Sequence, residues 1–428
     1  MSIVLTSFFT TMISIIHKYR GDVLKFAGDA LIIYFPPGPG VSSRGLACAL
    51  EMNEDLHDYP AAAGRTLSLH IAVLKIPEGA DALKGSVLGS LSGKRFEFAV
   101  HSPYITDSGI ILDGTSGGEV GCNSLILEDV SVAKGVKVGE TVRGEYFKVL
   151  NNDECLAALR VTKAEEPRPP QPPKTKNTDL SPFIPYPVLE YNSHSLSTYL
   201  ASLRVISTVF ISLPSMADFA TSNEQFSSCL SLLTSAGGLL RQYCMDDKSN
   251  VFIAAFGCPL MSHQDDTKRC LDFCLGVLRS APQSNIGVSR GSCYCGVLGC
   301  ADRCEYVVLG GKVNLAARLM GVAMKSGGQG KVVVDEDTYT LLKDDPTYGW
   351  SDPVEEEIKG FGPTRTYGVA QSDVTDSSEY DGDGEDVLRG QEKTVEVIQR
   401  ELAKDKAGTN RIVLTAPTGM GKTLVLAR

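Results

Sequence analysis

The sequence predicts an α+β fold that contains two copies of one structural unit. Both halves show the same order of patterns, in which a helix precedes a hairpin and a second helix and further strands follow. VLGSLSGKRFEFAV at 87–100 resembles VLGCADRCEYVV at 297–308, because both contain V-L-G and then R-x-E with an aromatic residue. A proline-rich stretch, KAEEPRPPQPPKTKNTDLSPFIPYP at 163–187, separates the copies and favours an extended linker.

A second change in composition divides the chain again. QSDVTDSSEYDGDGED at 371–386 is acidic, contains few apolar residues and is not expected to pack. The predicted order is a first domain at 1–162, a linker at 163–189, a second domain at 190–370, an acidic linker at 371–386 and the start of a third domain at 387–428.

The composition fits a protein with large buried cores and no extended basic surface. The chain has 428 residues, 43% of them hydrophobic, and a formal net charge of -10. This charge argues against a general nucleic-acid or anionic-membrane surface, although a local basic pocket for phosphate is compatible with it. The 12 cysteines without regular spacing indicate buried thiols in a reducing, cytoplasmic compartment.

Two local patterns have alternative interpretations. Cys293 and Cys295, with Cys300 and Cys304 nearby, form a possible zinc site, but C-x-C lacks the usual zinc-knuckle spacing and cysteines in a strand fit better. The N-terminal MSIVLTSFFTTMISIIHKYR fits an amphipathic or buried helix better than a signal peptide. No run reaches the roughly 18–20 apolar residues that span a bilayer, so we expect no integral membrane segment.

A hairpin is predicted in the first copy at GDVLKFAGDALIIYF, residues 21–35, with Gly28 and Asp29 at its tip. The corresponding segment of the second copy is GLLRQYCMDDKSNVFIAAF at 238–256, which has a longer turn. The Asp29 carboxylate suits a hard cation such as magnesium. A lone Asp in a turn, however, is more often only a turn former.

In the second copy, EYVVLGGKVNLAARLM at 305–320 runs from a strand through two glycines into a helix. Asn314 and Arg318 lie one helical turn apart on the same face of that helix. An Arg guanidinium suits recognition of a phosphate and stabilisation of the charge that develops on it. An Arg on a helix surface is otherwise usually only solvated.

Together these segments resemble the class III nucleotidyl cyclases, and among them the soluble, bicarbonate-responsive adenylyl cyclases. The resemblance is carried by KFAGDAL, LRVISTVFISL, IGVSRGSCYCGVLG, EYVVLGGKVNLAAR, VVVDEDTYTLL and IKGFGPTRTYGV, in the order of the family. It implies two ferredoxin-like cyclase domains paired head to tail as a pseudo-dimer, with the active site between them. There the ribose 3'-hydroxyl of ATP, or of GTP, attacks the α-phosphate with the help of two Mg²⁺ or Mn²⁺ ions.

The resemblance assigns roles to single residues. Asp29 matches the second metal-binding aspartate, Asn314 the residue that orients the ribose, and Arg318 the residue that stabilises the pentavalent phosphorus centre. At the positions of Asn314 and Arg318 the first copy has Thr106 and Ile110. Because the two copies have lost opposite halves of a site, one composite active site and one degenerate site are predicted.

The chain departs from the family pattern at several positions. Only 28 residues precede Asp29, so the strand with the first metal aspartate, about 45 residues before the hairpin in the family, is expected to be missing, with the chain truncated at its N-terminus. The adenine-reading positions hold Gln242, which can hydrogen-bond a purine edge, and Val307, which cannot. Lys25 matches the Lys of a bicarbonate site whose Arg has no counterpart near 107–109.

The C-terminal APTGMGKT at 416–423 fits the Walker A pattern, between the apolar strand RIVLT and the helical TLVLAR. The predicted phosphate-binding residues of this P-loop are Ala416, Gly419, Gly421, Lys422 and Thr423. LRGQEKTVEVIQREL upstream resembles the entry of signalling ATPases related to the AAA class. No Walker B carboxylate follows, so we do not expect ATP hydrolysis by this piece.

The expected function is therefore that of a nucleotidyl cyclase, with ATP as substrate and cyclic AMP and pyrophosphate as products, in cytoplasmic signalling. The alternative is a catalytically inactive cyclase-fold module that binds a nucleotide or regulates the P-loop ATPase. Asp29, Asn314 and Arg318 favour catalysis. Gln242 and Val307 favour the alternative.

Overall fold

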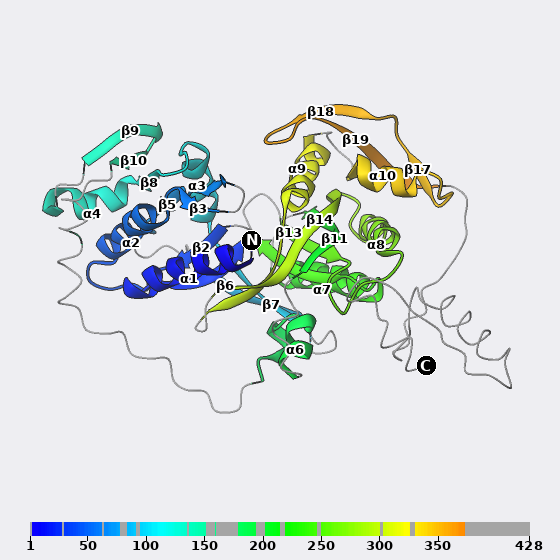
Figure 1. Cartoon of the computed structure of the whole chain (residues 1–428), viewed down its shortest axis with the longest axis horizontal. Coiled ribbons are helices and arrows are strands. Elements are labelled where there is room, and N and C mark those ends of the chain that lie inside the picture. The colour runs from blue at the N-terminus through cyan, green and yellow to red at the C-terminus, as the bar shows by residue number, and fades with distance from the viewer. Residues whose placement is uncertain are drawn as a thin grey trace. The chain divides into compact units, whose positions relative to one another are not determined.

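The chain folds into two compact units of mixed α and β structure (Figure 1). This is a computed structural model that describes residues 2–27, 30–61, 64–77, 84–90, 95–134, 137–150, 159, 179–193, 202–214, 219–245, 250–299, 303–325 and 330–372. Unit 1 comprises Met1–Ser86, Val100–Asp179 and Val297–Tyr306, and unit 2 comprises Val87–Ala99, Leu180–Gly296 and Val307–Arg428. The α+β class predicted from the sequence is confirmed.

Unit 2 is built on a β-α-β-β-α-β core. Its elements are β11 (Ser202–Leu213), α7 (Phe219–Ser235), β12 (Leu239–Met245), β13 (Asn250–Phe256), α8 (Asp266–Ser280) and β14 (Asn285–Gly299). The strand β11 lies between β13 and β14, and β12 is the outer neighbour of β13, with every pair antiparallel. The first strand thus lies between the third and the fourth, as in ferredoxin-like folds.

Further elements flank this core. Ahead of it lie η2 (Ser181–Phe183) and α6 (Tyr186–Ser193), and after it come β15 (Cys304–Leu309), α9 (Gly311–Lys325), β16 (Val332–Asp335), α10 (Glu336–Leu342), β17 (Tyr348–Trp350), β18 (Val354–Ile358) and β19 (Gly362–Gln371). Strand β16 joins the sheet parallel to β14, and β19 pairs antiparallel with β16, β17 and β18. Together with β15, which pairs with β14, the sheet has nine strands within the described residues.

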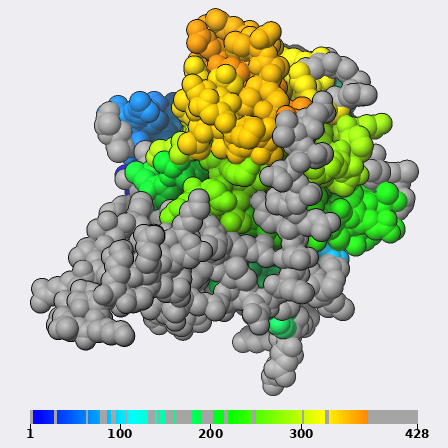
Figure 2. Space-filling model, turned by 90° about the vertical axis from the view of Figure 1, so that its right-hand side faces the viewer, coloured from blue at the N-terminus to red at the C-terminus, as the bar shows by residue number. Residues whose placement is uncertain are grey.

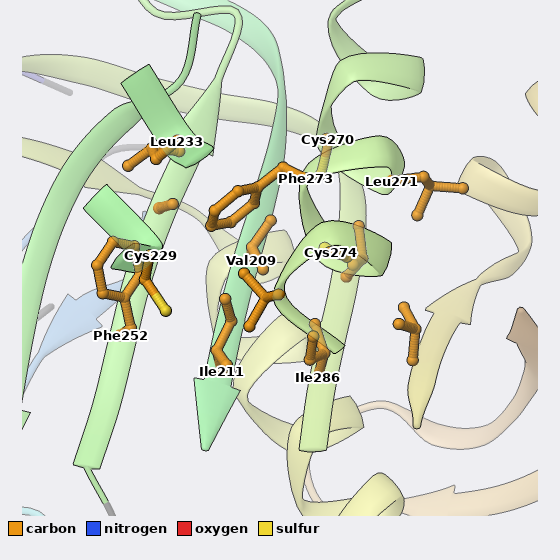
Figure 3. Packing of buried hydrophobic residues seen from close by; sticks show 14 of the residues in the cluster. Val209, Ile211, Cys229, Leu233, Phe252, Cys270, Leu271, Phe273, Cys274 and Ile286 are labelled. Atoms are coloured by element: carbon orange, nitrogen blue, oxygen red, sulfur yellow. The ribbon is translucent and has the colours of Figure 1, made fainter. Parts of the chain in front are cut away.

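The main core of unit 2 lies between one face of this sheet and the helices α7 and α8 (Figure 3). Val209 and Ile211 alternate along β11 toward the same side as Ile286 of β14. Phe252 of β13 packs beside Phe273 of α8, with ring centroids 6.2 Å apart. This apolar face explains why the period-two pattern of LRVISTVFISL forms a central strand.

Helix α9 covers the opposite face of the same sheet. Val332 and Val334 of β16 belong to the core under α7 and α8, whereas Val333 between them packs with Leu315 and Leu319 of α9. Successive strand residues point to opposite faces, so the two helical layers sandwich the sheet.

Gly287 of β14 allows α9 to lie directly on the strand backbone. A Cβ atom at position 287 would be 2.2 Å from the carbonyl oxygen of Ala316 and 2.2 Å from the amide nitrogen of Met320. Both atoms belong to the helix backbone, which cannot move aside as a flexible side chain would. Only glycine is compatible with this approach.

Unit 1 repeats part of this plan. Its elements are α1 (Ser2–Lys18), β1 (Asp22–Ala27), β2 (Ala30–Tyr34), α2 (Val41–Leu56), β3 (Tyr59–Pro60), β4 (Thr66–Leu67), β5 (Ile71–Val73), α3 (Pro103–Asp113), β8 (Val120–Asn123), α4 (Ser124–Lys134), β9 (Lys137–Arg143) and β10 (Tyr146–Leu150). The sheet order β5-β8-β10-β9, with β5 parallel to β8, reproduces β14, β16, β19 and β18 of unit 2. The predicted N-terminal helix is confirmed as α1, in which Ile13 and Ile16 are fully buried.

The hairpins of the two units share a bulge. The register of β1 against β2 shifts between Val23 and Lys25, and that of β12 against β13 shifts between Leu240 and Gln242. The sequence repeat aligns Lys25 with Gln242, so the irregularity occupies the same position in both copies. Bulges are specific local features, and a shared one supports the predicted duplication.

Each unit includes a short piece from the other repeat. Most of the hairpin β6 (Lys84–Ser90) and β7 (Arg95–His101) belongs to unit 2, whose main core contains Leu88. The tip of the β14–β15 hairpin belongs to unit 1, where Nη2 of Arg303 donates to the carbonyl oxygen of Leu24 at 3.4 Å. The two exchanged hairpins contain the V-L-G segments at 87–89 and 297–299, which are part of the sequence repeat.

Cys293 and Cys295 lie in a strand, as the sequence favours over a zinc site. Cys293 and Cys295 are buried on β14, Cys304 is exposed, and Cys300 lies outside the described residues. Within the ranges given above, no group of His, Cys, Asp and Glu side chains is arranged to hold a metal, and no helix is long and apolar enough to cross a membrane. The P-loop at 416–423 lies outside the described residues, as does the acidic linker from 373 onward.

The contact at Gly287 yields a test of this packing. Gly287→Ala should lower the free energy of unfolding by about 3 kcal/mol, because the added methyl group meets helix backbone on two sides. The matched control is Gly321→Ala on α9, where an added Cβ meets nothing within 4 Å and should raise stability by up to about 1 kcal/mol. Thermal or urea unfolding of both variants measures the difference, and equal effects would contradict the packing described.

Candidate functional site

Asn314 and Arg318 lie on the exposed face of α9. The helix begins at Gly311, directly after β15, and buries Leu315, Ala316 and Leu319 against the sheet. Both Asn314 and Arg318 are exposed. The predicted geometry of one shared helical face is thus confirmed.

The Arg318 side chain makes no hydrogen bond and no ion pair with any residue in the described part of the chain. A guanidinium carries five donors in a planar fork, which suits two oxygens of one phosphate. Nothing in the packing of unit 2 therefore requires an Arg at this position. The arrangement leaves the whole donor set available to a ligand.

Gln242 lies on β12 and is almost fully buried. Its Nε2 donates to Sγ of Cys244 at 3.1 Å. A thiol sulfur is a weak acceptor, so a better acceptor would displace it at little cost. The amide remains chemically suited to a purine edge, as the sequence suggests.

Val307 lies on β15 and is 1% exposed. Its side chain has neither donor nor acceptor, so it offers a base only hydrocarbon contact. The structure keeps this position inside the packing of unit 2, three residues before the glycine turn that starts α9.

The candidate residues of the first copy belong to unit 1. Lys25 lies buried on β1. Asp29 falls between β1 and β2 and lies outside the described residues, so its predicted role stays a prediction. Thr106 and Ile110, which stand at the positions of Asn314 and Arg318, lie on α3. The P-loop residues likewise remain predictions.

A charged group lies beside the start of α9, and no pattern in the local sequence predicts it. Lys312 Nζ lies 2.9 Å from Oδ2 of Asp335 and also donates to Asp337. Burial alone would lower the pKa of Lys312, but the hydrogen bonds and charges of the two carboxylates outweigh it and raise the pKa above its usual value. Lys312 is therefore charged throughout the physiological pH range. An Asp directly before a helix is a typical N-cap, so the sequence indicates Asp335 as the cap of α10. The sequence does not indicate that Lys312 is a partner of this Asp.

Comparison with known proteins identifies the domain that carries α9. The family of the adenylate and guanylate cyclase catalytic domain matches residues 200–371. Residues 200–371 form a class III cyclase domain. Both Asn314 and Arg318 lie within the matched range.

The chain is also similar to curated proteins over parts outside the cyclase domain. Adenylate cyclase type 10 of Homo sapiens is 25% identical over 339 residues, which cover 71% of this chain and 20% of that protein. Adenylate cyclase type 10 of Oryctolagus cuniculus is 31% identical over 187 residues, covering 40% of this chain and 11% of that protein. The chain thus matches about a fifth of the length of the first of these relatives.

Solved structures of cyclases also match the chain. The adenylyl cyclase CyaB from P. aeruginosa is 20% identical and covers 42% of this chain and 99% of its own, with a TM-score of 0.35. The guanylate cyclase domain of RhGC from Catenaria anguillulae, solved with GTP, is 21% identical and covers 40% of this chain and 100% of its own, with a TM-score of 0.34.

The exposure of Arg318 predicts that the cyclase domain does not need it for stability. Arg318→Ala should change the free energy of unfolding by less than about 0.5 kcal/mol. The matched control is Arg269 of α8, whose side chain is 5% exposed and whose Nε donates to Asp265 at 2.7 Å. Arg269→Ala should cost about 2 kcal/mol, because a charged hydrogen bond is lost. Thermal unfolding compares the two, and a large loss in Arg318→Ala would show a structural role instead.

Proposed function

We propose that this chain is part of a nucleotidyl cyclase that converts ATP to cyclic AMP and pyrophosphate in intracellular signalling. The proposal is carried by one observation: Arg318 is exposed, has no partner among the described residues, and lies one turn from Asn314 on α9 of the cyclase domain. The choice of ATP is supported by the similarity to curated proteins named adenylate cyclase type 10. The cytoplasm stays the expected compartment.

In the proposed reaction the ribose 3'-hydroxyl loses its proton to solvent and its oxygen forms a bond to the α-phosphorus. The bond from the α-phosphorus to the pyrophosphate oxygen breaks, and pyrophosphate leaves. Negative charge increases on the oxygens of the α-phosphate in the transition state. The guanidinium of Arg318 donates hydrogen bonds to those oxygens and stabilises that charge. The amide of Asn314 holds the ribose so that the 3'-oxygen is directed at the phosphorus.

Magnesium or manganese is part of the proposal through Asp29 of the first copy. Within the described residues no carboxylate group is arranged to hold a metal. The roles proposed for Asn314 and Arg318 rest on the hydrogen-bonding groups of their own side chains. A bound divalent cation would lower the pKa of the attacking hydroxyl and neutralise phosphate charge. The proposed site needs residues of both repeats and therefore an intramolecular pairing of the two units.

A second candidate function is nucleotide binding without turnover, as a regulatory module. The buried and apolar Val307 favours it, because this position offers no polar group to a base. Under this alternative Arg318 contributes to the affinity for a triphosphate and not to a rate. The two functions therefore differ in what Arg318→Ala changes.

The catalytic proposal predicts a selective loss of rate. Arg318→Ala should lower kcat by on the order of 100-fold or more and leave KM for ATP nearly unchanged, because the lost contact acts mainly in the transition state. Production of cyclic AMP from ATP with Mg²⁺ or Mn²⁺ measures the rate. Lys325→Ala, at an exposed position in the last turn of the same helix, is the control and should retain full activity. Weakened ATP binding in a chain without turnover would favour the regulatory module.

The chemistry at the base-reading positions predicts weak purine selectivity. The Gln242 amide has both donors and an acceptor, and Val307 has neither, so ATP and GTP should differ in kcat/KM by no more than about tenfold. A site that relies on a specific polar contact discriminates by 10⁴ or more. Parallel assays of both nucleotides test this. A preference above about 1,000-fold would mean that another residue reads the base.

A further inference from the structure

The first turn of α9 is linked by charge to the helix that follows the next strand. Lys312 contacts Asp335, at the end of β16, and Asp337, in the first turn of α10. The side chain of Asp335 is 3% exposed, whereas that of Asp337 is 56% exposed. One partner of the ammonium group is therefore held inside the domain.

Asp335 joins three elements through a single carboxylate. Its Oδ2 accepts from Oγ of Ser289 on β14 at 2.7 Å and from Lys312 of α9 at 2.9 Å. Its Oδ1 accepts from the amide nitrogen of Thr338 at 3.1 Å and from the Thr338 hydroxyl at 2.7 Å, which caps α10. A buried carboxylate with this many partners is confined to one position.

The aliphatic stem of Lys312 passes over β14 at Gly291. A Cβ atom at position 291 would lie 2.7 Å from Cγ of Lys312, so the absence of a side chain there leaves room for the stem. Gly287, on the same strand, permits the backbone contact with Ala316. The glycine contact fixes how far α9 lies from the sheet, and the ammonium contact fixes where its first turn lies along it.

Lys312 does not point to the same side as the candidate catalytic residues. Asn314 is two residues further on, which corresponds to a rotation of about 200° around the helix. Lys312 instead lines a cavity of about 430 Å³ together with Asp335, Phe361 and Arg365. Several residues that line this cavity belong to α10, β18 and β19. The segment α10 and β17–β19 is orange in Figure 2 and forms the upper surface in that view. The Lys312 ammonium is therefore directed toward Asp335 and Asp337 and not toward the face of Asn314 and Arg318.

We propose that Lys312 is a positioning residue, which holds the first turn of α9 through Asp335 and Asp337 and thereby directs Asn314 and Arg318 at the nucleotide. The inference rests on the proposed function of α9 and adds a residue to it. Arg318 has no partner of its own among the described residues. Its position is therefore set by the helix that carries it, and the helix is fixed at Lys312.

The variant Lys312→Met tests this, because it keeps most of the stem over Gly291 and removes the charge. It should lower kcat about tenfold with KM for ATP within about twofold, since small displacements of reacting groups cost rate. The control is Lys268→Met on α8, where Lys268 Nζ lies 3.0 Å from Oδ2 of Asp345. It removes a Lys–Asp contact from the same unit and should leave kcat unchanged. An equal loss in both variants overturns the proposal.

A double variant separates positioning from a general loss of structure. If Lys312 acts only by directing the Asn314 and Arg318 face, the double variant Lys312→Met with Arg318→Ala should be nearly as active as Arg318→Ala alone. A further tenfold loss in the double variant would show that Lys312 acts through something else, and would refute the role assigned to it.

Hydrogen exchange gives a readout that does not depend on turnover. The backbone amides in the first two turns of α9 should exchange faster in Lys312→Met than in the unmodified chain, and at the same rate in Lys268→Met. Unchanged exchange in Lys312→Met overturns the inference even if the chain is an active cyclase. A chain without turnover refutes the proposed function instead, and the exchange rates then decide whether Lys312 holds α9.

Discussion

The backbone contact between α9 and β14 at Gly287 is the constraint on which the candidate site depends. It places the helix directly on one face of a sheet whose other face is covered by α7 and α8. Once Leu315 and Leu319 are buried against that sheet, the helical period turns Asn314 and Arg318 outward. Two exposed polar residues with little packing of their own are thus directed by the packing of their helix, and this arrangement suits groups that must meet a ligand.

The two units share several elements but differ at the position of the candidate site. Both units keep the bulged hairpin and the parallel strand pair, β5 with β8 and β14 with β16. In unit 2 the strand β11 joins the hairpin to β14. Among the described residues of unit 1 no strand has that place, and its hairpin and its four-stranded sheet stay separate. The helix α3, the counterpart of α9, carries Thr106 and Ile110 and so has neither the amide nor the guanidinium at these positions.

Features that are encoded within one segment of this chain can be predicted from its sequence. The two paired strands of the first hairpin and the Asn–Arg spacing on α9 each lie within one segment, so the local pattern of strand and helix predicts them. The contact of Lys312 with Asp335 spans 23 residues and exists only because β14, α9 and α10 meet. Gly287 likewise resembles any strand glycine until the helix above it is known. Asp29 and the P-loop lie outside the described residues and remain predictions.

The buried surroundings of Gln242 bear on which part of a nucleotide the domain would recognise. Its Nε2 is bound to the sulfur of Cys244, a weak acceptor, and its oxygen can accept a hydrogen bond, so the amide can meet either an amino group or a carbonyl on a purine. Val307 adds no polar contact that would favour one of the two. Discrimination between bases at these two positions is therefore expected to be small. The Arg318 guanidinium and the Asn314 amide on α9 are suited to phosphate and ribose, which all nucleoside triphosphates share. In the proposed reaction the retained polar groups of α9 act on the ribose and the α-phosphate, so they do not select among nucleoside triphosphates by their bases.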